Sequence, residues 1–408
     1  MATSINRVMF RFIHTSDWHL GQNFYGYDRS EEQRDFLRQL ADIVSAQQPD
    51  ALLVSGDIYH TAAPASSTVS MYVEAMLDIH EACPGMAIIV IAGNHDSAAR
   101  LDSDSLLWQR AGVNVLGGVA RDTDGNALLD RHLIHVGDSG IVAAVPFCYP
   151  GAFPQIKEGH AVREQRQQAF FQALLERADS VNPQGLPVVL MAHLAVTGSD
   201  FTGHDGPMMM DSVALDSLGT GYDFAALGHI HRQQQLSDRA RYCGTPLAVS
   251  FDEQCEHSVS LVEIDAHRSL PVIRNLPIKN LKPLHTIPAR LPVDFETVMN
   301  LLYNIDGYEN AYVRLNVLID GKLPHDAQTR AATELEKKNC RFCCIKRTLP
   351  PGAGGHPPRM SLEELTAKRP IDVADRFFKD KTGDSMNVLQ REMFNEAYQQ
   401  VLTDIREQ

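Results

Sequence analysis

Side chains that could do chemistry gather in short clusters directly after the apolar runs of this chain. Asn94, His95 and Asp96 follow the run "AIIVIA", and the cluster "GHIH" follows "FAAL". The runs "RFIH", "ALLVS" and "PVVLMA" lead into the rest, which brings the whole set to Asp17, His19, Asp57, His60, Asn94, His95, Asp96, His193, His229 and His231. Carboxylate, imidazole and amide groups without a thiolate suit Mn²⁺, Fe²⁺ or Zn²⁺ better than a soft metal.

Each cluster taken alone also has a simpler explanation. Gly-Asn often makes a turn, an Asp after a strand often caps a helix, and a single His such as His193 is more often a core residue than a ligand. Five strands that all end in Asp, Asn or His are better explained by one shared site, because the carboxyl edge of an α/β sheet is where such sites form. We therefore predict that the five clusters meet at one sheet edge.

The number of these side chains is sufficient for two metal ions, with one carboxylate bridging them. Paired ions about 3.5–4 Å apart serve in-line phosphoryl displacement, because they lower the pKa of a bridging water and neutralise charge on the transition state. The clusters therefore predict hydrolysis of a phosphate ester.

The elements that must position these residues form an α/β layer structure. Several apolar runs are continuous, which is typical of strands that are buried on both faces. Between them, residues 30–48, 66–82 and 163–180 carry apolar side chains at helical spacing. We expect a layered α/β domain over residues 1–280.

A smaller unit follows this domain. Residues 281–349 read as strand, helix, strand, helix and strand, which predicts a compact α/β domain. Residues 350–408 begin with the connector "LPPGAGGHPPR" and continue with two helix-like stretches. One stretch places an apolar stripe on one side, and this stripe either packs on its own domain or docks on a partner: Val388, Met393, Phe394, Tyr398, Val401 and Leu402.

Composition excludes several classes of protein. The formal net charge of −14 argues against a basic nucleic-acid-binding face spread over the whole chain. There is no apolar run long enough for a membrane span and no leader-like start, so we expect a cytoplasmic protein. The seven cysteines do not suggest a disulfide framework, and the cluster Cys340, Cys343 and Cys344 lacks further ligands at zinc-site spacing and reads as a strand.

The ordered pattern D-x-H, G-D-x-x-H, G-N-H-D, H and G-H-x-H resembles the calcineurin-type metallophosphoesterases. The stretches "HTSDWHLGQNFY", "GHIHR" and "YCGTPLAVSFDE" resemble the nucleases of this family in particular. The likeness covers residues 7–265 and, more loosely, the rest of the chain. It implies a β-sandwich flanked by helices, a small α/β capping domain, and a helical tail that docks on the root of a coiled-coil ATPase.

The resemblance also implies a role for each residue. Asp17, His19 and His231 would hold one ion, Asn94, His193 and His229 would hold the second, and Asp57 would bridge them. His95 would act on the substrate phosphate, and His60 would lie near it and position a nucleic-acid strand. Asp96 would orient a neighbour by a hydrogen bond, or would simply cap a helix.

The function implied is a Mn²⁺-dependent DNA nuclease of repair, recombination and replication. It would act as an exonuclease on duplex ends and as an endonuclease on single strands and hairpins. Helix 66–82 lies where the family forms a homodimer, although it could simply cover the sheet. The rival functions are a phosphomonoesterase or cyclic-nucleotide phosphodiesterase on the same fold, and a catalytically dead scaffold. The segment Met208–Met210 has no role that we derive.

Overall fold

The computed structural model divides the chain into two compact units, residues 1–316 with 324–346, and residues 317–323 with 347–408. It describes residues 9–156, 162, 165–203, 212–253, 255–304, 309–319, 322–350, 370–382, 385–388, 390–391, 393–395 and 398. None of the helices in this described part has the length and apolar character that crossing a bilayer requires.

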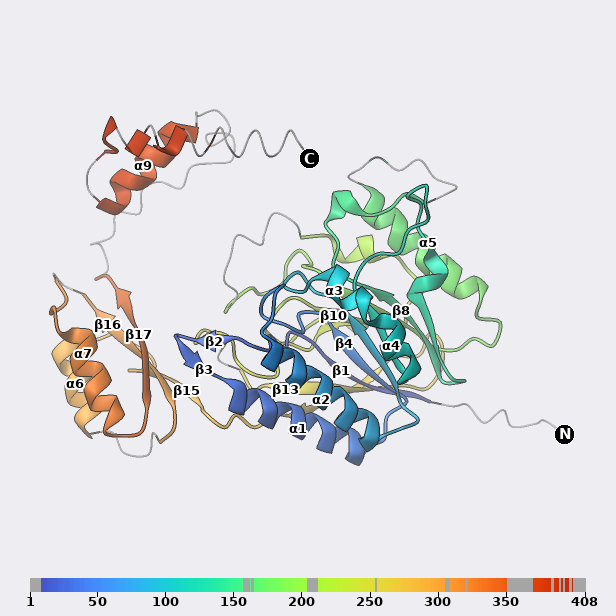
Figure 1. The fold of residues 1–408 in the computed structure, drawn as a ribbon, viewed down its shortest axis with the longest axis horizontal. Coiled ribbons are helices and arrows are strands. Elements are labelled where there is room, and N and C mark those ends of the chain that lie inside the picture. The colour runs from blue at the N-terminus through green and yellow to red at the C-terminus, as the bar shows by residue number, and fades with distance from the viewer. Residues whose placement is uncertain are drawn as a thin grey trace. The chain divides into compact units, whose positions relative to one another are not determined.

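Two six-stranded sheets form the centre of the first unit (Figure 1). The first has the order β14-β13-β1-β4-β5-β6, with bounds Val272–Pro277, Ser258–Ile264, Phe10–Thr15, Ala51–Ser55, Ala87–Ile91 and Val113–Leu116. The second has the order β11-β12-β10-β9-β8-β7, with bounds Gln234–Ser237, Ala240–Tyr242, Phe224–Gly228, Val188–His193, Gly140–Val145 and Leu133–Val136. The strands β1, β4, β5 and β6 are parallel, as are β8, β9, β10 and β12.

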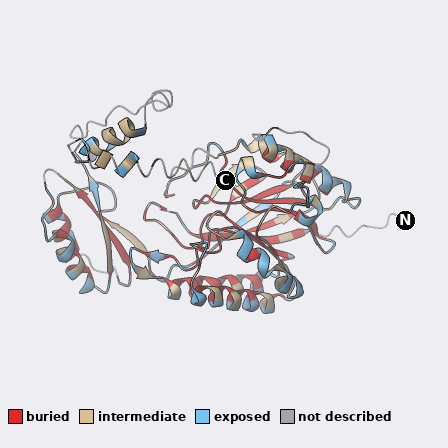
Figure 2. Ribbon diagram, turned by 45° about the horizontal axis from the view of Figure 1, so that its top comes forward, coloured by how far each residue is buried: buried red, intermediate tan, exposed pale blue. Residues whose placement is uncertain are grey.

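The central strands are buried on both faces (Figure 2), as their continuous apolar runs predict. Phe12, Leu53 and Ile89 belong to a core that also contains Val142 and Met191 of the second sheet, so this core lies between the sheets. Their alternating neighbours on the same strands face the opposite way and meet helices. The two sheets therefore form a sandwich, and the predicted layered fold is confirmed.

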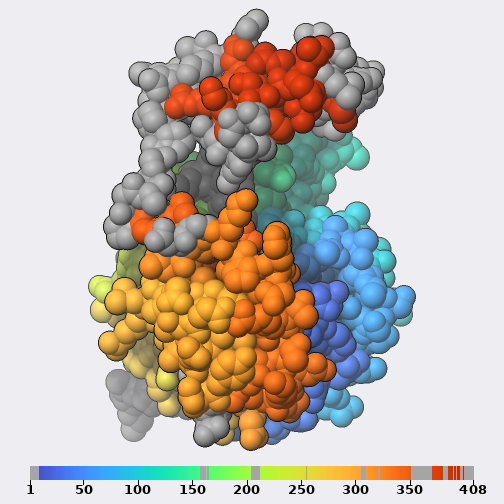
Figure 3. All heavy atoms as spheres, turned by 90° about the vertical axis from the view of Figure 1, so that its left-hand side faces the viewer, coloured from blue at the N-terminus to red at the C-terminus, as the bar shows by residue number. Residues whose placement is uncertain are grey.

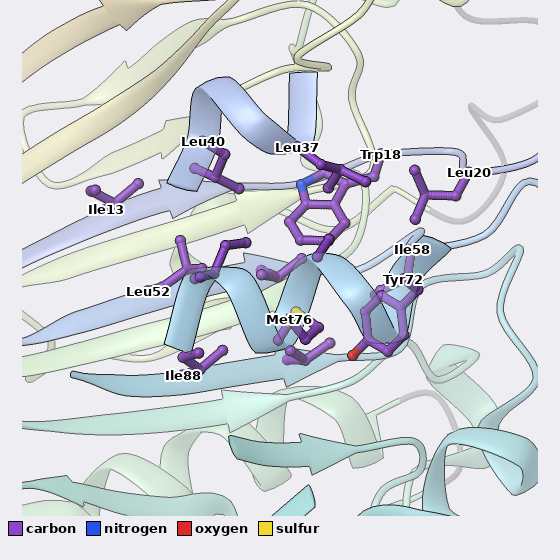
Figure 4. Close-up of a cluster of buried hydrophobic side chains, with 14 of the residues drawn as sticks. Ile13, Trp18, Leu20, Leu37, Leu40, Leu52, Ile58, Tyr72, Met76 and Ile88 are labelled. Atoms are coloured by element: carbon purple, nitrogen blue, oxygen red, sulfur yellow. The ribbon is translucent and has the colours of Figure 1, made fainter. Parts of the chain in front are cut away.

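Helices cover the outer faces of this sandwich. α1 (Ser30–Gln47) and α2 (Ser66–Ala82) lie over the first sheet, where Trp18, Leu40 and Met76 share one core with Leu52 and Ile88 (Figure 4). α5 (Arg166–Ser180) covers the second sheet through an apolar face that includes Phe170, Phe171 and Leu174. Full burial of such a side chain contributes roughly 1.5–3 kcal/mol. The helices expected in these three segments are present.

The small domain has the predicted order of elements. β15 (Leu284–Ile287), β16 (Tyr312–Leu318) and β17 (Arg341–Thr348) form a sheet in that order, and α6 (Phe295–Asn304) and α7 (Ala327–Glu336) lie on it; Figure 3 views this face. The predicted strand through Cys340, Cys343 and Cys344 is β17, apart from Cys340, which directly precedes it. Among the described residues no cysteine belongs to a group of possible metal ligands.

Shorter elements complete the described chain. They are β2 (Asn23–Phe24), β3 (Tyr27–Asp28), α3 (Ala98–Ser103), α4 (Ser105–Arg110), α9 (Pro370–Thr382) and single 3₁₀ turns at Leu129–His132, Pro150–Ala152 and Leu215–Leu218. The predicted tail helix is described only in part, and Met208–Met210, Val401 and Leu402 lie outside the described residues. The domain boundaries at 280 and 349 stay a prediction.

One expectation is wrong. The five clusters do not share a single sheet edge, because β1, β4 and β5 belong to one sheet while β9 and β10 belong to the other. The two sheets stack with the carboxyl ends of these strands at the same end of the sandwich, so the clusters still meet.

Candidate metal centre

The loops after five strands place all ten predicted residues around one buried centre. β1, β4 and β5 are in parallel register, so the loops that follow them emerge side by side. The same holds for β9 and β10, in which Gly228 pairs with His193. Because the inner faces of the two sheets share one core, the loops of both sheets converge at this end.

The backbone at the centre is held in a costly conformation. Four of the predicted residues have positive φ angles, although none is a glycine: Asp17 (55°), His19 (46°), Asp57 (52°) and His229 (101°). Each such residue costs of the order of 1–3 kcal/mol and persists only where the surrounding structure enforces it. Hydrogen bonds do so here, since Asp17 N donates to Gly56 O (2.9 Å) and His19 N donates to Asp57 O (3.0 Å).

Two glycines are required by close approach. A Cβ atom at Gly56, where φ is +91°, would collide with the ring of His193. A Cβ atom at Gly93 would collide with the Asp57 carboxylate. The glycines that precede Asp57 and Asn94 in the sequence therefore let the loops of the two sheets come into contact.

One group of ligand atoms is formed by Asp17, His19 and His231, whose donor atoms all lie within 4.8 Å of one another. The Nε2 atoms of His19 and His231 are 3.2 Å apart. All three side chains are buried, and their donor atoms face each other. This geometry is suited to a cation.

A second group adjoins it through Asp57. Asp57 Oδ2 lies 3.7 Å from His19 Nε2 and 3.6 Å from His193 Nε2, so this carboxylate stands between the two groups. On the far side, Asn94 Oδ1 is 3.0 Å from His193 Nε2 and 2.7 Å from His229 Nδ1. His193 Nδ1 is held by the carbonyl oxygen of Ser55 at 2.8 Å.

The electrostatics of the centre favour a bound cation. Burial, and next the Asp57 carboxylate, raise the pKa of Asp17 well above its usual range, and burial raises the pKa of Asp57 to about 6. Burial lowers the pKa of His193 to about 4. Among the described residues no Lys or Arg forms an ion pair with either carboxylate. Buried acids without a protein cation, next to neutral imidazoles, fit divalent metal ions.

His95 and His60 lie beside the two groups and are only partly buried. His95 N donates to Asp57 Oδ1 (2.9 Å), and His95 Nδ1 is 2.9 Å from the carbonyl oxygen of His60. Their rings are stacked with centroids 5.8 Å apart, and the His95 ring is 4.9 Å from that of His19. The donor atoms of these three histidines also lie within 4.8 Å of one another, so the geometry alone leaves His95 within reach of an ion.

Asp96 supports the loops rather than capping a helix. Its carboxylate accepts hydrogen bonds from the backbone N–H groups of Gly93 (2.8 Å), Tyr59 (2.9 Å) and Ile58 (3.1 Å). The helix that follows, α3, has Ser97 at its N-cap. Burial, and next the Asp57 carboxylate, raise the pKa of Asp96 to about 7. Asp96 thus ties the loop after β5 to the loop after β4.

Sequence reasoning missed Glu253. This side chain is 6% exposed, and its Oε1 lies 3.5 Å from Nδ1 of His231. Its Oε2 accepts from Thr245 Oγ1 at 2.8 Å and from Val249 N at 3.2 Å. A carboxylate behind a ligand histidine orients the ring and fixes which nitrogen faces the metal. The motif pattern ends at His231, and no spacing rule connects it with a residue 22 positions later.

Comparison with known proteins agrees with this geometry. The model of the calcineurin-like phosphoesterase family matches residues 10–233. The SbcD subunit of the SbcCD nuclease from Rhodobacter capsulatus is 34% identical over 297 residues, which is 68% of this chain and 73% of that protein. The protein of the same name from Escherichia coli K12 is 31% identical, over 69% of this chain and 71% of its own length.

A solved structure, that of a dimetal phosphatase from Danio rerio, aligns with 66% of this chain and 99% of its own at 13% identity and a TM-score of 0.37. This likeness is too weak to support an argument. The family match and the two nuclease relatives do support one: the chain belongs to the calcineurin-like phosphoesterases and, within them, to the SbcD family, which makes it a phosphodiester hydrolase and a metal-dependent nuclease subunit.

Proposed function

We propose that the centre binds two divalent ions, most suitably Mn²⁺, and that the chain uses them to cleave DNA. Asp17, His19 and His231 would hold one ion, and Asn94, His193 and His229 the other. Asp57 would bridge them, because its carboxylate stands between the two groups. Oxygen and imidazole donors without a thiolate support Mn²⁺ over a soft metal.

Two ions in this position supply a water of lowered pKa and neutralise charge on a phosphodiester. The chain's own residues do the rest. His95 lies at the half-exposed side of the centre, where its Nε2 edge would stabilise the phosphate or protonate the leaving oxygen. The hydrogen bonds of its backbone N–H with Asp57 and of its Nδ1 with His60 hold the ring in place. His60 stacks on it and would position the strand.

The substrate and partner follow from the relatives. Their shared name, which makes them the SbcD component of the SbcCD nuclease, supports a nuclease that works with an SbcC-type ATPase, and we assign it DNA ends, hairpins and single strands as substrates. A formal net charge of −14 is compatible with this role, because bound ions, local cations and a partner protein would supply the attraction to phosphates. The tail after residue 350 would dock on the coiled-coil root of the ATPase, and α2 would contribute to a homodimer.

The observation that carries this proposal is that all ten predicted residues converge on one buried centre whose carboxylates lack a protein cation among the described residues. The test is cleavage of a linear duplex, a hairpin and a single strand by the purified chain with Mn²⁺, alone and with its ATPase partner. The matched control is Asp57→Asn, which keeps the shape of the side chain and removes its charge. We expect the wild type to cut DNA and the variant to fail.

The rival functions predict other outcomes. Hydrolysis of a chromogenic phosphomonoester or a cyclic nucleotide without DNA cleavage would favour a phosphatase or cyclic-nucleotide phosphodiesterase. Binding of Mn²⁺ or of the partner without hydrolysis of any of these substrates would favour a scaffold. Either result would overturn the proposal.

A further inference from the structure

An aromatic pair lies beside the metal centre and is not part of the ligand pattern. Phe147 and Tyr149 follow β8, the strand next to β9 in the second sheet. Their rings meet edge to face with centroids 5.0 Å apart. Tyr149 is 62% exposed, which is unusual for a large ring next to a buried site.

The pair is fixed to the centre from two directions. Phe147 N donates to Ala92 O (2.9 Å), which joins the end of β8 to the residue before the Gly93-Asn94 turn. The Phe147 ring lies 6.5 Å from that of His229 in a nearly parallel orientation (23°), and 6.2 Å from that of His193, edge to face. Phe147 therefore forms a wall against two of the proposed ligands, and Tyr149 extends this wall outward.

A pocket of about 130 Å³ opens between the wall and the centre. Among the described residues its lining includes Asn94 and His229 on one side and Phe147, Tyr149 and Pro150 on the other. The same described lining contains no Lys or Arg, so it does not suit a phosphate. Drug-sized ligands occupy pockets of about 300–1,000 Å³, whereas a space of this size suits one flat ring or part of one.

We propose that Tyr149 is a stacking platform for the nucleobase next to the scissile phosphate. This inference rests on the proposed nuclease function and specifies its substrate, a nucleotide that is unpaired at the point of cleavage. Every base has a π-face, so aromatic stacking binds a strand without reading its sequence, and it contributes independently of charge. The latter matters in a chain with a formal net charge of −14, which gains little from bulk attraction to phosphates.

A base must leave the duplex stack before Tyr149 can cover its face, so frayed ends, hairpin loops and single strands would satisfy this platform and a rigid duplex interior would not. Phe147 acts as the positioning residue, because it holds the Tyr149 ring through an edge-to-face contact and is itself held by the backbone of Ala92.

The test compares cleavage at a single phosphate with and without its neighbouring base. End-labelled single strands, one intact and one with a tetrahydrofuran abasic residue beside a chosen phosphate, are cut by the full-length chain with Mn²⁺ and resolved at nucleotide level. Wild type should cut about tenfold more slowly beside the abasic residue. Tyr149→Ala should cut both strands at the same rate, whereas Tyr149→Phe should keep the wild-type ratio. The matched control is Tyr303→Ala, at another exposed tyrosine on α6, which should also keep it.

A second measurement does not depend on cleavage. A strand carrying 5-iodouracil is irradiated with the full-length chain in Ca²⁺, and the cross-linked peptide is identified by mass spectrometry. We expect a cross-link to Tyr149 that Tyr149→Ala removes. Equal rates in wild type on both strands, a tenfold ratio that survives Tyr149→Ala, or a cross-link elsewhere would overturn this inference alone. Wild type that cuts neither strand would overturn the proposed function and this inference together.

Discussion

Opposite ends of the same sandwich hold equally buried carboxylates in very different surroundings. Asp57, after the carboxyl end of β4, and Asp223, before the amino end of β10, are each 1% exposed. Asp223 accepts from Val188 N (2.7 Å) and from the backbone of Arg268, and lies 2.8 Å from His267 Nδ1 and 3.6 Å from Arg239. Asp57 accepts from His95 N and otherwise faces imidazoles.

The comparison shows that burial of an acid does not by itself mark a functional site. At the amino end, backbone donors and an arginine already satisfy the charge of Asp223, so that end contributes to stability. At the carboxyl end, among the described residues, the protein supplies no Lys or Arg, and burial raises the pKa of Asp57 to about 6. The charge deficit at this end is what a metal ion would fill.

The largest expected effect is on activity at the carboxyl end. Asp57→Asn should lower DNA cleavage by about 10⁴-fold or more, because both ions would lose a shared ligand while the amide keeps the hydrogen bond from His95 N. Cleavage rates with saturating Mn²⁺ check this. A loss below tenfold would contradict a bridging role.

Stability should separate the two ends in the opposite sense. Asp223→Ala should reduce the free energy of unfolding by about 3–5 kcal/mol, because it leaves a buried arginine contact and backbone donors without their acceptor. Without metal, Asp57→Asn should not reduce it, because the substitution removes a buried charge that has no cation. Urea unfolding in EDTA checks both variants, and destabilisation by Asp57→Asn comparable to that of Asp223→Ala would end the distinction.

His95 tests the division of labour inside the centre. His95→Ala should lower turnover by about 10²- to 10³-fold while two Mn²⁺ ions still bind, because His95 would act on the phosphate and not on the metal. Calorimetric titration with Mn²⁺ beside rate measurements decides between the two. Loss of an ion would instead make His95 a ligand, in keeping with its place in the His19, His60 and His95 group.

Glu253 should matter through His231. Glu253→Gln should weaken Mn²⁺ at one site by about 10- to 100-fold and leave the other site unchanged, because the carboxylate orients only this ligand ring. Two-site Mn²⁺ titration measures it. Asp200→Asn is the matched control, since that exposed carboxylate pairs with Arg232 away from the ligand rings, and equal weakening in both variants would refute the assignment.

The smallest effect concerns the choice of substrate. His60→Ala should slow cleavage of duplex ends on the order of fivefold more than cleavage of flexible single strands, because a flexible strand reaches the centre without being positioned. Paired rate measurements on one sequence in both forms check this. Equal losses on both substrates would refute a positioning role for His60.

Much of this organisation could be predicted from sequence. Continuous apolar runs such as "PVVLMA" predicted strands buried on both faces, and the polar residues after them predicted where a site would form. The division of these strands between two sheets could not be predicted, because the partner of β1 across the strand pair is β13, more than 240 residues away. Local patterns carry no information about such pairing.

The residues that sequence reasoning missed or left open have the same physical explanation. Glu253 reaches His231 only through the fold, and an aromatic residue after a strand, such as Phe147, reads as core until its neighbours are known. The choice between cap and support for Asp96 depended on which backbone N–H groups lie within reach, and these belong to another loop.

The central claim is that the carboxyl end of the sandwich is a two-metal centre bridged by Asp57. A crystal structure of the chain grown with Mn²⁺, with anomalous data at the manganese edge, tests it most directly. We predict two anomalous peaks on either side of the Asp57 carboxylate, one among Asp17, His19 and His231 and the other among Asn94, His193 and His229. A single peak held by His19, His60 and His95, or no peak at this end of the sandwich, would contradict it.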